Sequence, residues 1–579
     1  MKINIITKGL AGLVAVGVLS TTLTSCKDDY LDLAPITDIS TNTVTSTMVG
    51  AQAAMVGLCN GMYRYCDFGI NDPCGEPYLI GFYGDAMGNA SLKSLELYYE
   101  WRFVNWTYMN NPAASYGTNM WRYAYNLIDN ANNILAVIDN VEASEDEVAD
   151  RNNIKAVALT IRAHAYIRLL QMYAPRWEDS NNGNTYCLIL RTEPATVDNV
   201  DKDFSTMSQV LGQVYGDLNE AISIWKEIGD MRGSNIWMPN IDVAYGLYAR
   251  AAMIQNDYDE AIAKATLAMA NHPIMSADQY RSGFIYANSE YLWATDLEVV
   301  AVGQRAWGNF FGTNGNYTAR FDCPDSIDYT LYQQLSMTDC RKLLYFTPEL
   351  IELTPVLADA FDITPEDFFL PYTKGGIIYP TGYDILCLDP QYKAVNYALT
   401  YAWGDYPEYG SALVTYDSDL TEPDTYYNIR FGQGFKFWGI GNYCYNNFPF
   451  MRASEMGYIV AEAQYMLGNT TEAQEMMNYL NKDVRDPEYD CTLTGDDLLD
   501  HIKAYREIEL WDEGFSWFDL KRWGDPCVRK AWVEGDPNSG NWGPEVKSFD
   551  PSFNAGWRYS VPESEFLYNK GADPMKVMY

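Results

Sequence analysis

The stretch from residue 451 to 524 constrains the fold most, because its apolar residues recur with the period of an α-helix. One face of 454–467 is apolar, Gly468 ends that helix, and 470–480 and 498–508 each carry an apolar stripe of their own. Residues three and four positions apart lie on one face of a helix, so each stripe is a packing surface. The stretch therefore predicts helices packed on helices.

Two local patterns refine this prediction. Asn469 is expected to cap the helix that follows it, with Glu472 three residues on as the reciprocal partner. Charged and large aromatic residues alternate densely over 505–524. Because the stems of Lys and Arg lie readily along apolar surface, this alternation predicts helices that cover a core with stacked Arg and Trp side chains, and not a catalytic centre.

The amino terminus reads as a targeting segment. Residues 1–25 contain two Lys, no acidic residue and an apolar run from Leu10 to Leu19, which is typical of a secretory signal peptide and too short for a retained spanning helix. Small residues precede Cys26 in a pattern that resembles a bacterial lipobox. That resemblance implies acylation of Cys26 and anchoring at a membrane without spanning it. The Lys and Asp residues that follow resemble a surface-export signal.

An internal repeat strengthens the helical prediction. Ala249, Ala261, Ala268 and Pro273 have the spacing of the small residues and the proline of a tetratricopeptide repeat, and Asp257 is expected to cap its second helix. The twelve-residue separation recurs between two alanines in the C-terminal stretch, Ala461 and Ala473. Small residues let two helices approach closely. We therefore expect a mainly α fold built on tetratricopeptide-like repeats.

The rest of the chain fits one domain with a long insertion. No linker divides residues 26–579, so we expect one domain after the signal peptide. The helical frame is expected over about 48–273 and 451–524. Between them, about 274–450 is rich in Gly, Pro, Tyr and Trp, and contains a predicted strand at Glu298–Val302. Long loops held by a rigid frame often carry binding sites.

The C-terminal stretch also carries a family resemblance. It resembles the C-terminal signature of the SusD/RagB family, the outer-membrane nutrient-binding lipoproteins of Bacteroidetes, except that Ser516 stands where that family usually has an Arg. The residues that carry the resemblance are Ser454, Glu455, Met456, Ala461, Glu462, Ala463, Arg506, Glu509, Leu510, Glu513, Gly514, Trp517, Phe518, Asp519, Leu520, Lys521 and Arg522, with Val561, Pro562, Glu565 and Asn569 near the end. The resemblance implies a SusD-like fold, glycan capture at the cell surface and delivery to a SusC-like TonB-dependent transporter in the outer membrane.

Two aromatic clusters are the candidate ligand site. Aromatic residues make up 15% of the chain, and two clusters, 98–106 and 305–317, interleave aromatic residues with polar ones, the second also with Gly and Asn. Trp and Tyr rings offer flat apolar faces to the C–H faces of a sugar ring, and neighbouring polar side chains can bind its hydroxyls. The resemblance places the glycan platform in the same two regions. The predicted ligand-binding residues are Tyr98, Trp101, Trp106, Trp307, Phe310, Phe311, Asn316 and Tyr317.

The net charge of the chain and the absence of common catalytic and metal-binding motifs narrow the classes of function that it could have. A net charge of −37 repels nucleic acid and suits a neutral or cationic ligand. The three histidines are far apart in sequence, the eleven Cys match no zinc pattern, and no G-x-S-x-G, H-E-x-x-H or P-loop pattern occurs. We therefore predict a binding protein, not an enzyme, without a metal or other cofactor. Residues 179–183 resemble part of a calcium loop too weakly to change that prediction.

Two alternatives stay open. The chain contains 77 carboxylates, among which a pair suited to glycosidic hydrolysis could lie, as in a surface glycoside hydrolase. Some relatives of the SusD family serve peptide import, so the ligand could be a peptide held in a deep polar pocket. A shallow aromatic platform distinguishes the glycan-binding prediction from peptide import, whereas a hydrolase would need two carboxylates flanking the aromatic groove about 5–10 Å apart.

Overall fold

The computed structural model describes residues 47–63, 75–92, 103–281, 283–296, 325–353, 364–366, 377–378, 429–432, 434, 436–437, 446–543 and 546–577. Helices dominate this part of the chain, and its strands are two to four residues long. The prediction of a mainly α fold is confirmed. The strand predicted at Glu298–Val302 lies outside the described residues.

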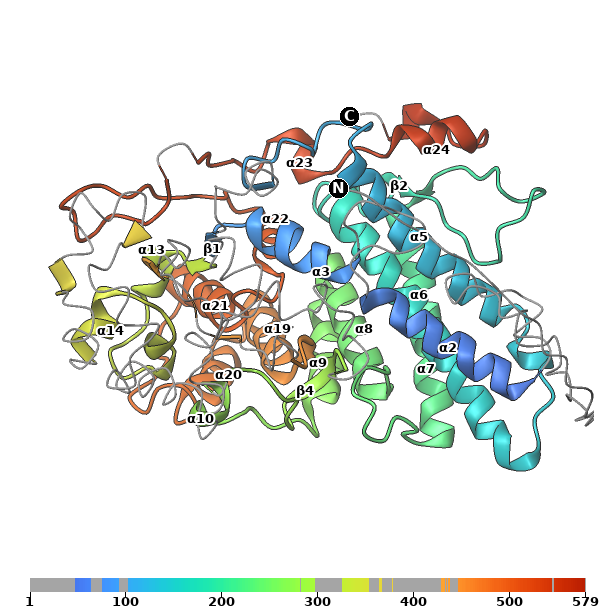
Figure 1. Ribbon diagram of the computed structural model, residues 1–579, viewed down its shortest axis with the longest axis horizontal. Coiled ribbons are helices and arrows are strands. Elements are labelled where there is room, and N and C mark those ends of the chain that lie inside the picture. Colours follow the sequence, from blue (N-terminus) through green and yellow to red (C-terminus); the bar gives the residue numbers. More distant parts are fainter. Residues whose placement is uncertain are drawn as a thin grey trace, which may run out of the picture.

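The first part of the frame is a row of helices whose neighbours in the chain pack side by side. From α5 onward, each helix of the row contacts the next, and α2 lies against α5 and α6 (Figure 1). Most side chains of α6 are buried, which makes it the inner helix. The row contains α2 (Met48–Tyr63), α5 (Ser115–Leu135), α6 (Val148–Tyr173), α7 (Met207–Ile228), α8 (Ile241–Gln255) and α9 (Tyr258–Met269).

The row continues across the insertion. Helix α9 packs against α19, although the long insertion separates them in sequence, and α19 in turn packs against α20 and α21 (Figure 1). Strand β4 (Tyr291–Ala294) pairs with β8 (Pro449–Arg452) and so joins the two ends of the insertion. The C-terminal helices are α19 (Ala453–Met466), α20 (Thr470–Asn481), α21 (Asp496–Glu509) and α22 (Ser516–Trp523).

The repeat alanines lie where two helices meet. Ala249, Ala261, Ala268, Ala461 and Ala473 are all fully buried. The pairs α8–α9 and α19–α20 pack closely, as the repeat predicts. Gly246 shows how close the approach is, because a Cβ built on it would lie 2.2 Å from the sulfur of Met451. The tetratricopeptide-like prediction is confirmed.

One of the two predicted caps forms. Asp257 accepts a hydrogen bond from the backbone N–H of Glu260, as expected. The prediction for Asn469 is wrong, because its side chain makes no capping bond and its amide donates to the side chain of Gln464 at 2.8 Å. Gly468 has a φ of 81° and ends the preceding helix, as expected.

Short elements surround this frame. Strand β1 pairs with β5, β2 with β3 and β6 with β7, all antiparallel. The strands are β1 (Ser91–Leu92), β2 (Tyr186–Leu188), β3 (Ser205–Thr206), β5 (Ser326–Ile327), β6 (Ile377–Ile378) and β7 (Ile429–Arg430). The short helices are α3 (Glu76–Tyr78), η2 (Leu79–Ala86), η3 (Ile138–Asn140), η4 (Glu145–Glu147), α10 (Ala277–Tyr280), α13 (Tyr329–Tyr332), η6 (Cys340–Leu344), α14 (Pro348–Leu353), α23 (Asn554–Trp557), α24 (Glu563–Tyr568) and η11 (Pro574–Lys576).

The C-terminal segment returns to the N-terminal helices. The N–H of Tyr559 donates to the carbonyl of Met172, at the end of α6. The side chain of Asn569 bonds both the N–H and the carbonyl of Lys202. Figure 1 shows α24 beside β2 and α5. The C-terminal segment is thereby held against the N-terminal half of the chain.

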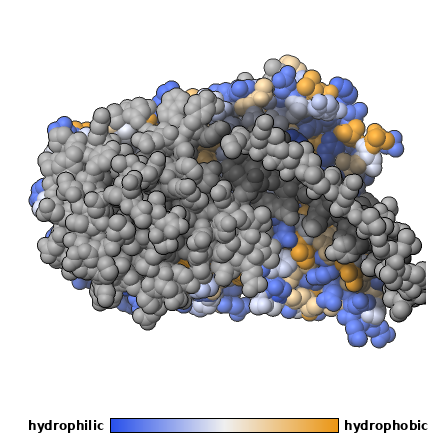
Figure 2. Space-filling model, viewed as in Figure 1, coloured by the Kyte–Doolittle hydropathy of each residue, from blue (hydrophilic) through white to orange (hydrophobic). Residues whose placement is uncertain are grey.

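The visible surface agrees with the acidic composition. Among the coloured atoms of Figure 2, hydrophilic residues predominate and hydrophobic ones lie scattered between them. In the part of the chain that the structure describes, no helix is long and apolar enough to cross a membrane.

Candidate ligand-binding region

Of the predicted site residues, the structure describes one. Trp106 lies in the described part of the chain. The other seven predicted ligand-binding residues and the predicted lipidation site lie outside it: Tyr98, Trp101, Trp307, Phe310, Phe311, Asn316, Tyr317 and Cys26.

Trp106 is a core residue, which corrects its assignment to the ligand surface. Its side chain is 2% exposed, and its ring stacks on that of Phe549 with centroids 3.9 Å apart. The ring of Trp557 meets it edge-on at 4.7 Å, and its indole N–H donates to the carbonyl of Met87 at 2.9 Å. Because aromatic neighbours and a backbone carbonyl occupy this side chain, it has no face for a sugar in this structure.

The described residues that flank 93–102 in the sequence contribute a ladder of aromatic rings. Phe103 is its centre, and we call the five rings the ring ladder: Tyr78, Phe82, Phe103, Tyr108 and Tyr116. Centroid distances between neighbouring rings run from 4.2 Å for Tyr78 and Phe82 to 5.7 Å for Phe103 and Tyr108. Three of the five rings are buried, while Phe82 and Tyr108 are partly exposed.

The partly exposed rings are what this region offers to a ligand. Phe82 and Tyr108 lie on either side of Phe103, and packing against the buried rings holds them in place. A ring fixed by packing presents its apolar face at little cost in conformational entropy. Sequence reasoning recorded the aromatic density over 66–118 but did not single out these two residues. Only the fold separates them from buried neighbours of the same type.

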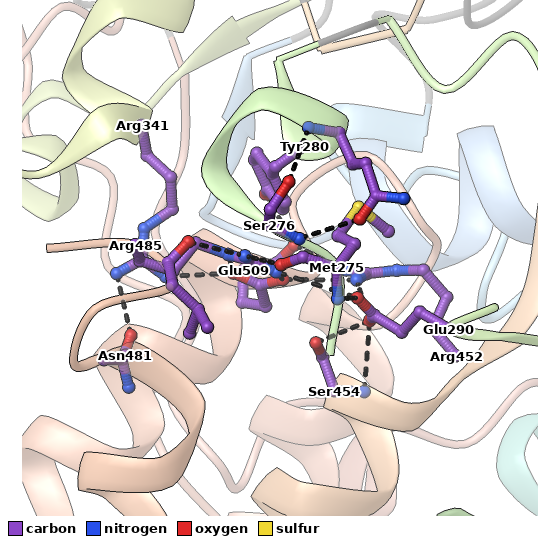
Figure 3. A network of polar contacts seen from close by, with 12 residues as sticks. Met275, Ser276, Tyr280, Glu290, Arg341, Arg452, Ser454, Asn481, Arg485 and Glu509 are labelled. Carbon is purple, nitrogen blue, oxygen red and sulfur yellow. Dashed lines mark hydrogen bonds and ion pairs between the residues drawn. The ribbon is translucent and has the colours of Figure 1, made fainter. Parts of the chain in front are cut away.

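The most concentrated group of charges lies elsewhere, in the C-terminal half. We call it the charge hub. It contains four cations and four carboxylates, and each side chain is at most 2% exposed. Its members are Arg341, Lys436, Arg452 and Arg485 with Glu290, Asp339, Glu509 and Glu513. Figure 3 labels five of them, Arg341, Arg452, Arg485, Glu290 and Glu509.

The hub joins segments that are far apart in sequence. Arg452, at the end of β8, contacts Glu290 at 2.6 Å, Glu509 at 3.2 Å and Glu513 at 2.8 Å. Glu509, at the end of α21, also accepts from Arg485 at 2.9 Å, and from Arg341 at 3.0 Å (Figure 3). The hub thus ties the insertion to the C-terminal helices.

The electrostatics of the hub are those of a closed structural network. Burial alone would raise the pKa of Glu509, but Arg485 and Arg452 hold it well below its usual range. Burial lowers the pKa of Lys436, while its contact with Glu513 opposes that shift. Each cation has a carboxylate within hydrogen-bond distance, so the charges are balanced inside the protein. The role of the hub is therefore structural: it stabilises the fold.

The three histidines lie in separate settings. His164 contacts the fully buried Glu76 at 2.8 Å, which Arg168 also contacts at 2.8 Å. Burial would raise the pKa of Glu76, but Arg168 and His164 lower it to about 2. The remaining two histidines bond other partners, His272 with Asp242 and Ser289, and His501 with Tyr489. Within the described residues, no group of three or more His, Cys, Asp or Glu is placed to hold a metal ion.

The weak calcium-like stretch forms a turn. The carboxylate of Asp179 accepts from Arg176 at 2.8 Å. Ser180 accepts from the N–H of Gly183 at 2.8 Å, and Asn181 and Asn182 have positive φ angles. The structure accounts for these residues by turn geometry and one ion pair.

Several charged residues that carried the family resemblance form ion pairs. Arg506 contacts Asp519 at 2.6 Å, and Arg522 contacts Glu462, all with buried or nearly buried side chains. The guanidinium of Arg506 lies over the Phe515 ring. The predicted stacking of Arg on aromatic rings is present, and buried ion pairs, which the sequence did not reveal, accompany it.

Ser516 fills the place of the expected Arg. Its buried hydroxyl accepts from the N–H groups of Asn89 and Ala90, both at 3.2 Å, and so joins α22 to the end of η2. It also hydrogen-bonds the carboxyl of Glu507 at 3.2 Å. Burial, and then the charge of Asp519, raise the pKa of Glu507 to about 8.

Comparison with known proteins agrees with this architecture. The model of the SusD family matches residues 399–572, and a SusD-like model described as starch-binding and associating with the outer membrane matches residues 29–251. The fold is thus that of a helical-repeat protein. The chain belongs to the SusD/RagB family. A search of curated proteins found no match.

Solved structures share the fold across nearly the whole chain. A SusD-like carbohydrate-binding protein from Bacteroides vulgatus is 19% identical with a TM-score of 0.66, and the match covers 91% of this chain and 98% of that one. A SusD superfamily protein from Bacteroides thetaiotaomicron is 18% identical with a TM-score of 0.60, covering 91% and 99%. A SusD-like carbohydrate-binding protein from Bacteroides fragilis is 15% identical with a TM-score of 0.57, covering 91% and 99%.

Proposed function

We propose that this protein is a lipid-anchored glycan-binding protein of the outer membrane, which captures an oligosaccharide or polysaccharide at the cell surface and delivers it to a TonB-dependent transporter. Membership of the SusD/RagB family supports the proposal, as do the carbohydrate-binding descriptions of two of its structural neighbours. The observation that carries the glycan part is the ring ladder. Its partly exposed rings, Phe82 and Tyr108, come before and after the segment that contains Tyr98 and Trp101 in the sequence.

The proposed platform combines described and predicted residues. Phe82 and Tyr108 supply rings held by packing, and Tyr98 and Trp101, which lie between them in the sequence, would extend them. The second predicted cluster, around Trp307, would add a further stacking surface. Sugar rings bind such surfaces through their apolar faces, with little need for charge, which suits a chain of net charge −37. Binding without bond cleavage is the proposed mechanism.

Anchoring and delivery are separate parts of the proposal. Cys26 would carry the acyl chains that hold the protein at the membrane. Labelling cells with a radioactive fatty acid should mark the wild-type protein and not a Cys26→Ser variant. Co-purification of the anchored protein with a TonB-dependent transporter would support delivery. A protein that fractionates alone, and whose deletion leaves glycan uptake unchanged, would contradict it.

The experiment for glycan capture is calorimetric titration of the full chain in a detergent without a sugar headgroup. Neutral and charged polysaccharides, oligosaccharides and peptides are titrated in turn, and each mixture is checked for products by chromatography. Binding of a glycan without new products supports capture. New shorter sugars would establish a hydrolase in its place, and binding of peptides alone would establish peptide import.

Matched variants test the platform. Tyr108→Ala and Trp101→Ala should each weaken glycan binding by about tenfold or more, because base–aromatic and sugar–aromatic stacking contacts are typically of that size. Trp106→Phe is the control, since this buried ring should affect stability and not affinity. Thermal melting of each variant separates the two effects. Unchanged affinity in Tyr108→Ala, Trp101→Ala and Trp307→Ala alike would contradict the proposed platform.

A further inference from the structure

A pocket lies on the helical frame, apart from the ring ladder. It opens between the end of α6 and helices α8, α19 and α22, and its volume of about 700 Å³ includes open solvent at its mouth. Trp177, Phe515 and Phe518 provide aromatic walls, and Met253 and Ile459 add apolar surface. The pocket can therefore hold a small molecule with a ring.

The lining carries more positive than negative charge. It contains five cations and three acids, although the whole chain has a net charge of −37. This composition differs from that of the strongly acidic chain, although two of the arginines pair with acids just outside the lining, Glu462 and Asp179. The cations are Arg176, Arg250, Arg506, Lys521 and Arg522, and the acids are Glu178, Glu455 and Asp519.

The guanidinium groups have carboxylate partners in the protein. Arg250 contacts Glu455 at 2.6 Å, and the shortest contact of Arg506, with Asp519, is also 2.6 Å. The other two arginines use acids outside the lining, Arg522 with Glu462 and Arg176 with Asp179. These pairs fix the walls and leave one lining cation without a carboxylate partner, while the third lining acid, Glu178, accepts a hydrogen bond from Asn256 at 2.6 Å.

Lys521 is that cation. It is 6% exposed, and its ammonium donates to the carbonyl of Gln171 at 2.6 Å. Among the residues that the structure describes, no carboxylate lies within 4 Å of it. Burial, and then the charge of Arg558, place its pKa well below the usual range, with a small opposing effect of Cys187. A buried ammonium without a counter-ion is costly, so this position gains strongly from an anion.

We propose that this pocket binds a small carboxylate that carries a ring, with the carboxylate at Lys521 and the ring against the aromatic walls. The carboxylate would neutralise the one unbalanced cation of the lining. Phe515 is held between the guanidinium groups of Arg250 and Arg506, at 5.5 and 5.2 Å, so one wall is rigid. Two sources supply this chemistry, an aromatic acid and an acidic sugar, and the experiment separates them.

The test is calorimetric titration of the full chain in detergent at pH 6, where both acids are ionised. Sodium benzoate and sodium galacturonate are the probes, and benzyl alcohol and galactose are their neutral controls. We expect one acid to bind at least tenfold more tightly than its neutral control. The acid that binds identifies the source. Binding of neither acid, or equal binding of acid and control, overturns the proposal.

Variants assign the binding to Lys521. Lys521→Met keeps the length of the side chain and removes the charge, and should weaken binding of the acid at least tenfold, while Lys521→Arg should restore part of it. Arg176→Gln, at the partly exposed rim, is a second variant that keeps the fold and should weaken binding about threefold. Acid binding unchanged in both Lys521→Met and Arg176→Gln overturns the proposal, and thermal melting checks that each variant is folded.

The pocket is independent of the proposed glycan platform. Tyr108→Ala should leave acid binding unchanged, and Lys521→Met should leave binding of a neutral polysaccharide unchanged. Failure of glycan binding and failure of acid binding are therefore separate results. If Lys521→Met lost both acid binding and polysaccharide binding while its melting temperature was preserved, that result would contradict the separation of the two sites.

Discussion

The charge hub and the Lys521 pocket bury cations in the same half of the molecule, with opposite outcomes. In the hub, four cations meet four carboxylates, and all eight side chains are sealed from water. In the pocket, the guanidinium groups are paired, but the ammonium of Lys521 bonds a carbonyl and lies over the Trp517 ring without a carboxylate partner, and the pocket that this residue lines opens to solvent. Burial of charge alone does not mark a binding site. A buried charge that lacks a partner and that a ligand can reach does mark one.

The difference has a physical cause. The free-energy cost of removing two charges from water is offset when each charge has a well-placed partner. A network that is fully paired therefore has no unpaired charge for a ligand to bind. An unpaired buried cation keeps its desolvation cost until an anion arrives. The following predictions compare matched residues of the two regions, from the largest expected effect to the smallest.

Arg452→Met breaks the centre of the hub. It leaves the carboxylates of Glu290, Glu509 and Glu513 short of one buried cation, and should lower the free energy of unfolding by about 4 kcal/mol. Urea denaturation followed by circular dichroism measures it. A loss below about 1 kcal/mol would show that the hub is not a closed network.

The two buried lysines, Lys436 in the hub and Lys521 in the pocket, give the sharpest comparison between the two regions. Lys436→Met removes the partner of Glu513 and should cost about 3 kcal/mol, whereas Lys521→Met removes an uncompensated charge and should stay within about 1 kcal/mol of wild type or gain stability. The same denaturation experiment compares them at pH 7. Equal losses in the two variants would erase the distinction between hub and pocket.

The pH dependence of Lys521→Met tests the same charge. The pKa of Lys521 is lower in the folded protein than in the unfolded chain, so the unfolded chain binds more protons below about pH 10. The contribution of Lys521 to the free energy of unfolding therefore rises as the pH increases toward about 10. The wild type should gain at least about 1 kcal/mol relative to Lys521→Met between pH 7 and 10. A constant difference across this range would contradict the unpaired, buried position.

The smallest effect is expected at the rim of the pocket. Arg176 pairs with the exposed Asp179, and an ion pair at the surface contributes little because water screens it. Arg176→Gln should change the free energy of unfolding by less than about 0.5 kcal/mol. A loss of several kcal/mol would mean that Arg176 is part of a structural network like the hub.

Much of the frame could be predicted from local patterns. The apolar stripes predicted helices that the structure contains, such as α19 and α21, within a few residues of their bounds. The repeat alanines predicted close helix pairs, because a small side chain at a helix contact has the same effect wherever it occurs. Asn469 was a failure of the same method, since its amide found a competing partner in Gln464.

The sequence by itself determined the helical frame, the repeat pairs and the family, because periodicity and small-residue spacing act through neighbours in the chain. Only the tertiary structure decided which aromatic and charged residues are core. Trp106 and Tyr108 are both aromatic and lie two positions apart in the sequence, yet Trp106 is buried and Tyr108 is partly exposed. Lys436 and Lys521 differ likewise, because their partners, Glu513 and the carbonyl of Gln171, come from distant segments. Partners brought together by packing set the environment of a side chain, and no local pattern records them.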